Sequence, residues 1–131
     1  MYLLDTNTLI YYFKGKGQVA ARLLLVPPRE VAVSSITVYE LEVGLAKSSA
    51  ARQRYTQVRD FLAFVSVLPF GGREASAAAA IRTTLERRGL PIGPLDNLIA
   101  GTAKAHQAML VTHNVSEFSR IGGLRIEDWY A

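Results

Sequence analysis

Cysteine is absent from the 131-residue sequence, and long apolar runs are absent as well. Without cysteine there is no disulfide framework and no zinc–thiolate site, and this absence fits a reducing compartment. No stretch approaches the roughly 20 apolar residues that span a bilayer. The first residues, Met1 to Asp5, lack a basic leader and are interrupted by an acid, unlike a signal peptide. We therefore expect a soluble cytoplasmic protein.

Histidine is also rare, and positive charges only slightly outnumber negative ones. The two histidines, His106 and His113, are not spaced as a local metal-binding pair. Lys and Arg number 15 against 11 Asp and Glu, which gives a formal net charge of +4. So small an excess is weak support for a polyanionic partner and equally describes an ordinary basic protein. Half of the residues are hydrophobic, so we expect one globular domain over residues 1–131.

Short apolar runs alternate with longer segments of helical period, the order typical of βαβ units around a parallel sheet. The sequence predicts strands at 2–4, 31–34, 65–68 and 109–112, and a short edge strand at 124–126. It predicts helices at 7–14, 18–26, 37–46, 50–64, 74–88 and 96–107. The expected fold class is α/β, with a central parallel sheet of four to five strands.

Oxygen-bearing side chains follow the predicted strands or begin the predicted helices. Asp5 ends the first strand, and Glu40 lies in the first turn of the helix after the second. Asp96 begins the helix before the fourth strand, and Asn114 follows that strand. Sites in open parallel sheets form at the carboxyl ends of the strands, so these groups are expected to converge. Clustered carboxylates repel one another unless a cation joins them, and oxygen ligands favour Mg²⁺ or Mn²⁺. One or two such ions can activate water and hold a phosphodiester, which suits a nuclease.

Each acid also has a purely structural explanation. Asp5 and Asp96 are favoured helix caps, and Thr37 with Glu40 has the spacing of a capping box. Thr6 is a further candidate cap. Glu42 is a contrast, because two residues along a helix turn it about 200° from Glu40. We expect Glu42 to be solvated or ion-paired.

Several other residues invite a functional role that we rate below a structural one. His106 is expected on a helix surface, and His113 near the site but not catalytic. Arg87 and Arg88 suit a helix C-terminus better than an RNA contact. At least one of three consecutive aromatic residues should point outward and offer an interface: Tyr11, Tyr12 and Phe13.

An ordered series of short motifs resembles the VapC toxins of toxin–antitoxin pairs, within the PIN-domain nucleases. The series covers essentially the whole chain: Leu4-Asp5-Thr6-Asn7, Ser35 to Leu41, Leu95 to Ala100, Leu110 to Phe118 and Leu124 to Trp129. The resemblance implies a three-layer α/β/α fold, Mg²⁺-dependent RNA cleavage, commonly a homodimer, and a VapB-type antitoxin in the active-site groove.

The resemblance also implies which residues form the site. By motif position the family's first three acids fall on Asp5, Glu40 and Asp96. A fourth acidic position, often Asp, is Asn114 here, and Glu117 one helical turn later is an additional candidate metal ligand. The missing charge puts a second metal ion in doubt.

Two other functions remain open from the sequence. Asp5 to Leu9 resembles the aspartyl-phosphate motif of haloacid-dehalogenase phosphatases, although Asn7 replaces the usual general acid. A covalent phosphoaspartate at Asp5 would identify that class. The other alternative is a PIN scaffold that binds RNA or a partner without catalysis. A receiver domain is excluded, because Pro69 to Gly72 after the third strand contains no acid.

Overall fold

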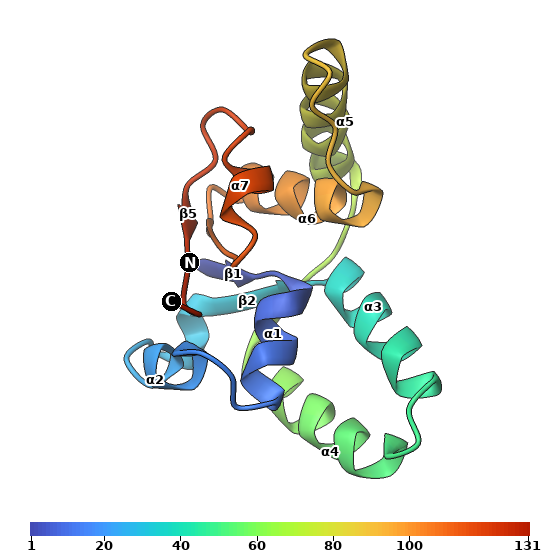
Figure 1. The fold of residues 1–131 in the computed structure, drawn as a ribbon, viewed down its shortest axis with the longest axis vertical. Helices are drawn as coiled ribbons and strands as arrows, with labels where there is room; N and C mark the ends of the chain where they lie inside the picture. The colour runs from blue at the N-terminus through green and yellow to red at the C-terminus, as the bar shows by residue number, and fades with distance from the viewer.

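The computed structural model describes residues 1–131 and contains a parallel sheet between two layers of helices (Figure 1). The strands are β1 (Tyr2–Leu4), β2 (Val31–Ser34), β3 (Ser66–Leu68), β4 (Met109–Val111) and β5 (Ile126–Glu127). They are ordered β3-β2-β1-β4-β5, and every pair is parallel. The predicted α/β/α class and the five-stranded parallel sheet are therefore confirmed.

The helices follow the predicted order, with changed ends. They are α1 (Thr6–Phe13), α2 (Val19–Leu23), α3 (Ser35–Ala46), α4 (Ala51–Leu62), α5 (Gly72–Arg87), α6 (Pro94–Ala105) and α7 (Val115–Phe118). A 3₁₀ turn covers Pro28–Glu30. Neither this turn nor α7 was predicted, because segments this short show no helical period. None of the helices is both long and apolar enough to cross a membrane.

Alternate residues of the central strands enter two separate cores. Leu3, Ala32 and Leu110 face α5, α6 and α7, whereas Leu4 and Val111 face α1 to α4. This division follows from the two-residue period of a strand. Because both faces are covered, the strands are apolar almost throughout, as parallel strands usually are.

Helices α5 and α6 cross at very close range. A Cβ built on Gly101 would lie 2.6 Å from the Cβ of Ala78, so only glycine permits this approach. The buried Asn97 side chain donates a hydrogen bond to the Ala78 carbonyl at 2.9 Å. The close approach at Gly101 and the Asn97 hydrogen bond fix the start of α6, where Asp96 lies.

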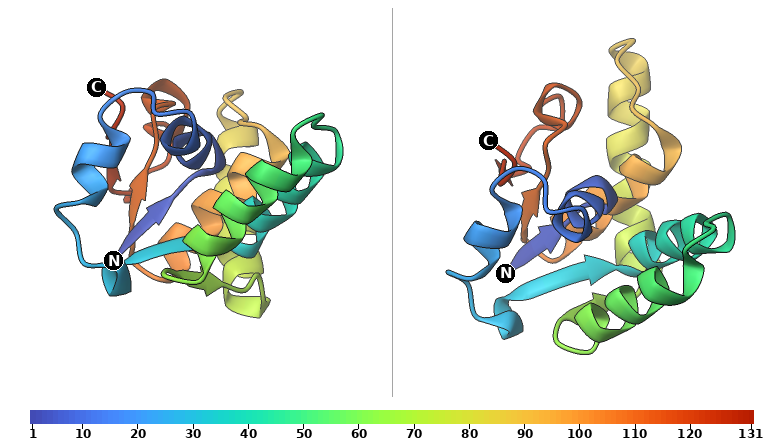
Figure 2. Two further views of the ribbon diagram at one scale, coloured as in Figure 1. Left: turned by 90° about the horizontal axis from the view of Figure 1, so that it is seen from below. Right: turned by 60° about the horizontal axis from the view of Figure 1, so that its bottom comes forward.

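The strand arrows point toward the side of the molecule where α1 and α3 begin (Figure 2). A parallel sheet presents all its strand C-termini at one edge, so residues just after the strands become neighbours. Leu4 pairs with Val111, and Leu3 with Ala32. Continuing these registers places Asp5 beside Thr112 and Ser34.

Candidate active site

Asp5 directly follows β1, at the edge of the sheet where the parallel strands end. Its amide donates to the Val111 carbonyl at 3.0 Å, which continues the sheet pairing for one residue past β1. Its carboxylate accepts from the Thr8 amide at 2.8 Å and caps α1. Burial raises the pKa of Asp5, opposed in part by hydrogen bonds from the Thr112 hydroxyl and the Thr8 amide. Asp5 is therefore the cap of α1 and also lies at the edge of the sheet where the strands end, whereas Thr6 is the first helical residue and not the cap.

Glu40 lies in the second turn of α3, because that helix begins two residues earlier than predicted. Ser34 is the cap, and its hydroxyl accepts from the Ile36 amide at 2.9 Å. Thr37 is consequently inside the helix, so the capping-box explanation of Glu40 is wrong. Glu40 instead turns its Oε1 to the Thr6 hydroxyl, 2.6 Å away.

Two threonines hold this arrangement. The Thr6 and Thr37 hydroxyl oxygens are 3.1 Å apart. A hydroxyl has one proton. Since the Thr6 proton goes to the Glu40 carboxylate, the Thr37 proton goes to Thr6. Glu42 on the same helix is exposed and has no ion-pair partner, as expected of a residue turned away from the site.

Asp96 is half-buried in the first turn of α6, which starts at Pro94 with Gly93 as its cap. It is thus the third residue of the helix and not the N-cap considered from sequence. The pKa of Asp96 is raised to about 6. Burial is the largest cause, and the negative charges of Asp5, Glu40 and Glu117 add to it. Four carboxylates are therefore close enough to influence one another's charge, and they come from the end of β1 and from α3, α6 and α7.

Asn114 and Glu117 form a single unit at the β4–α7 turn. The Asn114 side-chain nitrogen donates to Glu117 Oε2 at 2.8 Å, and the Asn114 amide donates to the Thr112 hydroxyl oxygen at 3.0 Å. The Thr112 hydroxyl proton is then free for Asp5. Asn114 thus holds Glu117 toward the cluster and leaves its own carbonyl oxygen available.

The donor chemistry of this edge fits a hard divalent cation. No three acidic or histidine side chains lie close enough together to form a complete set of metal ligands. The oxygen-only donors and the raised pKa of Asp96 nevertheless describe an excess of negative charge that a cation would neutralise. The residues present therefore fit a divalent cation that prefers oxygen ligands.

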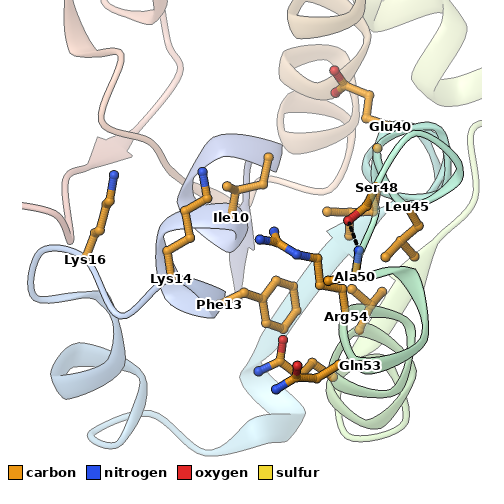
Figure 3. A pocket seen from close by; sticks show the side chains of 14 residues that line it. Ile10, Phe13, Lys14, Lys16, Glu40, Leu45, Ser48, Ala50, Gln53 and Arg54 are labelled. Atoms are coloured by element: carbon orange, nitrogen blue, oxygen red, sulfur yellow. Dashed lines mark hydrogen bonds between the residues drawn. The ribbon is translucent and has the colours of Figure 1, made fainter.

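A groove runs from Glu40 down the space between α1 and the α3–α4 hairpin (Figure 3). Its volume is ≈ 780 Å³. Apolar side chains such as Ile10, Phe13 and Leu45 line it. Cations come from Lys14, Lys16 and Arg54. The groove joins the acid cluster to a partly apolar, basic surface.

The remaining predicted residues lie outside the acid cluster. His106 was expected on the surface, but it is half-buried at the end of α6, with Nε2 3.0 Å from Glu74 Oε2. His113 is exposed beside the site, as expected, with Nδ1 3.0 Å from Asp128 Oδ2. Arg87 ends α5, as its helix-terminus explanation requires, and Arg88 donates to the Arg120 carbonyl at 3.0 Å. An RNA contact by this pair stays a prediction.

The aromatic run of α1 was expected to present an outward residue, and this was wrong. Tyr11, Tyr12 and Phe13 are all partly buried. Phe61 of α4 packs against Tyr12 and Phe13, with ring centroids 5.4 and 5.9 Å away. Tyr12 and Phe13 therefore pack against α4, whereas Tyr11 packs against His113 and Tyr130.

Sequence reasoning missed the threonines that orient the acids. Thr6 directly follows Asp5, Thr37 precedes Glu40 by three residues, and Thr112 directly follows β4. Their positions beside the predicted acids were the available signal. Their partners are 31 or more residues away, and no local pattern shows that.

The fold and the acid cluster define a class that comparison with known families identifies. The family model of the PIN domain matches residues 2–124. This covers all seven helices, the first four strands and every candidate ligand.

Relatives and solved structures match over nearly the whole length. The tRNA(fMet)-specific endonuclease VapC of Salmonella typhimurium is 38% identical over 128 residues, which are 98% of this chain and 97% of the relative. Ribonuclease VapC2 of Rickettsia felis is 37% identical, with 98% of each chain covered. The structure of Rickettsia felis VapBC2 bound to a promoter DNA fragment superposes with a TM-score of 0.91 at 36% identity, covering 98% of both chains. The chain therefore belongs to the VapC ribonucleases of the PIN-domain family.

Proposed function

We propose that this chain is an Mg²⁺-dependent endoribonuclease that acts as the toxin of a toxin–antitoxin pair, with Mn²⁺ able to replace Mg²⁺. PIN-domain nucleases generally depend on a divalent metal. The observation that carries the proposal is Asp96, whose pKa of about 6 reflects burial together with the charges of Asp5, Glu40 and Glu117. Such a cluster is unfavourable in itself and becomes useful when a cation binds.

Asp5, Glu40 and Asp96 are the proposed catalytic metal ligands. We propose Glu117 as a fourth ligand, and Asn114 as the residue that positions it and that offers its own carbonyl oxygen. When bound there, the ion supplies Lewis acidity toward a phosphodiester and a means to activate water. With one neutral side chain in the set, a second ion would be weakly held.

The protein's own contribution is to fix the carboxylates before the ion arrives. The Thr8 amide and the Thr112 hydroxyl orient Asp5, and the Thr6 hydroxyl orients Glu40. Asp96 is mostly ionised at neutral pH, because its pKa is about 6. Below pH 6 a proton would compete with the ion, so metal affinity should fall as the solution is acidified.

We propose the groove beside Glu40 as the seat of a VapB-type antitoxin segment. Its lining combines apolar contacts with the cations Lys14, Lys16 and Arg54, which suits a chain with apolar and acidic side chains. An occupant there would also cover the approach to the acid cluster. The relatives include VapBC complexes from Rickettsia felis and Salmonella typhimurium. We further propose that residues 1–131 form one PIN domain, that the protein is a homodimer, and that it acts in the cytoplasm.

The test is cleavage of 5′-labelled RNA by purified, antitoxin-free protein, with an initiator tRNA and a single-stranded RNA as substrates. Cleavage should be absent in EDTA and return with Mg²⁺ or Mn²⁺. Asp96→Asn purified identically controls for contaminating nuclease. Undiminished cleavage in EDTA would refute the metal mechanism, and no cleavage with metal would favour a non-catalytic PIN scaffold.

The phosphatase alternative finds little support in the geometry of Asp5. That carboxylate is 3% exposed and is engaged by the Thr8 amide and the Thr112 hydroxyl, so it is poorly placed to attack a phosphate. Asn7, at the position of the missing general acid, is exposed. Labelled phosphate retained on Asp5 after acid quenching would revive the alternative.

A further inference from the structure

Three aromatic rings from distant parts of the chain gather at the turn between β4 and α7, which also carries Asn114. His113 stacks on Tyr130, with centroids 4.2 Å apart and planes 23° apart. Tyr11 is 4.8 Å from Tyr130 and 5.9 Å from His113, and its ring is steeply inclined to both. These three distances place Tyr11 beside the stack and not on top of it. Tyr11 therefore does not cover the His113 face that is turned away from Tyr130, and 42% of the His113 side chain is exposed.

Contacts with Asp128, Gly17 and Gln18 fix the positions of the His113 and Tyr130 rings. Asp128 Oδ2 is 3.0 Å from His113 Nδ1, and Asp128 Oδ1 accepts from the Tyr130 amide at 2.9 Å. Gly17, with φ of +64°, lies so close to Tyr130 that a Cβ there would be 2.8 Å from the tyrosine ring. The Gln18 amide donates to the Tyr130 carbonyl at 3.1 Å. An imidazole with 42% of its side chain exposed is thus fixed in one orientation.

His113 lies in the chain between two residues that contact the acids. His113 lies between Thr112, which hydrogen-bonds Asp5, and Asn114, which holds Glu117. A polynucleotide bound at the acid cluster extends over several nucleotides, so an exposed ring in the β4–α7 turn can contact one of the bases that flank the bound phosphate. Unpaired bases commonly stack on aromatic side chains, and such stacking tolerates many sequences.

We propose that the open face of His113 stacks a base of the RNA substrate next to the phosphodiester that is cleaved. The inference rests on the ribonuclease function proposed above. His113 is then a substrate-positioning residue with no part in the chemical step. Tyr130 acts through it, because the stack of the two rings sets the plane on which the base lies.

Two substitutions of His113 separate stacking from other roles. His113→Ala removes the ring and should raise KM for a single-stranded RNA about tenfold, with a much smaller change in kcat, as expected for loss of one stacked base. His113→Phe keeps a flat ring without the Asp128 hydrogen bond and should retain most of the parent KM. Tyr55→Ala, which removes an exposed aromatic side chain from α4, is the matched control and should change neither constant.

Abasic substrates make the test specific to a base. Each nucleotide flanking the mapped cleavage point is replaced in turn by a ribose without its base. One replacement should raise KM about tenfold for the parent and for His113→Phe, yet have no further effect on His113→Ala. In EDTA, 2-aminopurine at that position should lose fluorescence on binding the parent but not His113→Ala, a readout that needs no catalysis.

The outcomes distinguish this inference from the function on which it rests. A parent protein that cleaves no RNA refutes the ribonuclease proposal. A parent that cleaves RNA, with KM and abasic profile unchanged in a folded His113→Ala, refutes the stacking inference alone. Unchanged KM with weakened binding of the antitoxin would also overturn it and assign the ring to the protein partner. Equal losses in the Ala and Phe variants would point to the Asp128 contact instead of stacking.

Discussion

Asp96→Asn is expected to abolish cleavage and at the same time to stabilise the metal-free protein. In the folded state the pKa of Asp96 is raised from 3.8 to about 6, by burial first and then by the neighbouring carboxylates. The unfolded chain loses these effects. The ionised Asp96 carboxylate therefore lowers the free energy of unfolding, by the full amount wherever the pH exceeds the folded pKa.

The size of the effect follows from the shift. A change from 3.8 to about 6 corresponds to about 3 kcal/mol. Asp96 is only half-buried, so solvent screening reduces the expected gain to about 1–1.5 kcal/mol. In a domain of this length that is a rise in melting temperature of about 3–6 °C.

The sign of the pH dependence is equally defined. Above pH 6 the parent pays the full cost of the charge, so the variant should be more stable there. As pH falls below 6 the folded parent takes up a proton, so the difference should shrink, and it should vanish below the unfolded pKa of 3.8. Thermal and urea unfolding in EDTA at pH 8 and pH 5 would measure both, with Glu42→Gln as an exposed control. A variant no more stable than the parent at pH 8, or equally stabilised at both pH values, would refute the reasoning.

Three further predictions concern the acids and the helix crossing. Glu40→Gln should lower kcat about 100-fold or more, while the exposed Glu42→Gln keeps most activity; the reverse result in the same RNA assay would contradict the orientation of α3. Glu117→Gln should weaken Mn²⁺ binding, with full retention in a calorimetric titration showing that the α7 turn does not reach the metal. Gly101→Ala should destabilise the fold by about 1–3 kcal/mol because its Cβ would meet α5, whereas Gly44→Ala, in open space on α3, should be neutral or stabilising in urea melts.

The sequence was most informative where one physical pattern dominated. Val31 to Ser34 was predicted with its observed ends, because a short apolar, β-branched run suits a strand buried on both faces. Asp5, Glu40 and Asp96 were identified because each follows a strand or lies early in a helix. The match to the PIN-domain model includes all three residues.

The errors arose where a local pattern competed with a distant contact. Thr37 and Glu40 match a capping box, but Ser34 caps the helix and releases Glu40 to Thr6. The four-residue helix α7 was missed because it is shorter than two helical turns. The groove cations and the His113–Tyr130 stack join segments separated by long stretches of chain, so only the structure reveals them.

The most direct test of the central claim is a calorimetric titration of Mn²⁺ into the metal-free protein at neutral pH, beside Asp96→Asn and Glu42→Gln. We expect saturable binding to the parent and to Glu42→Gln, with weaker binding as pH falls below 6, and little or none to a folded Asp96→Asn. Equal binding by all three proteins would mean that the ion lies elsewhere, and the carboxylates of Asp5, Glu40 and Asp96 would not form the metal site.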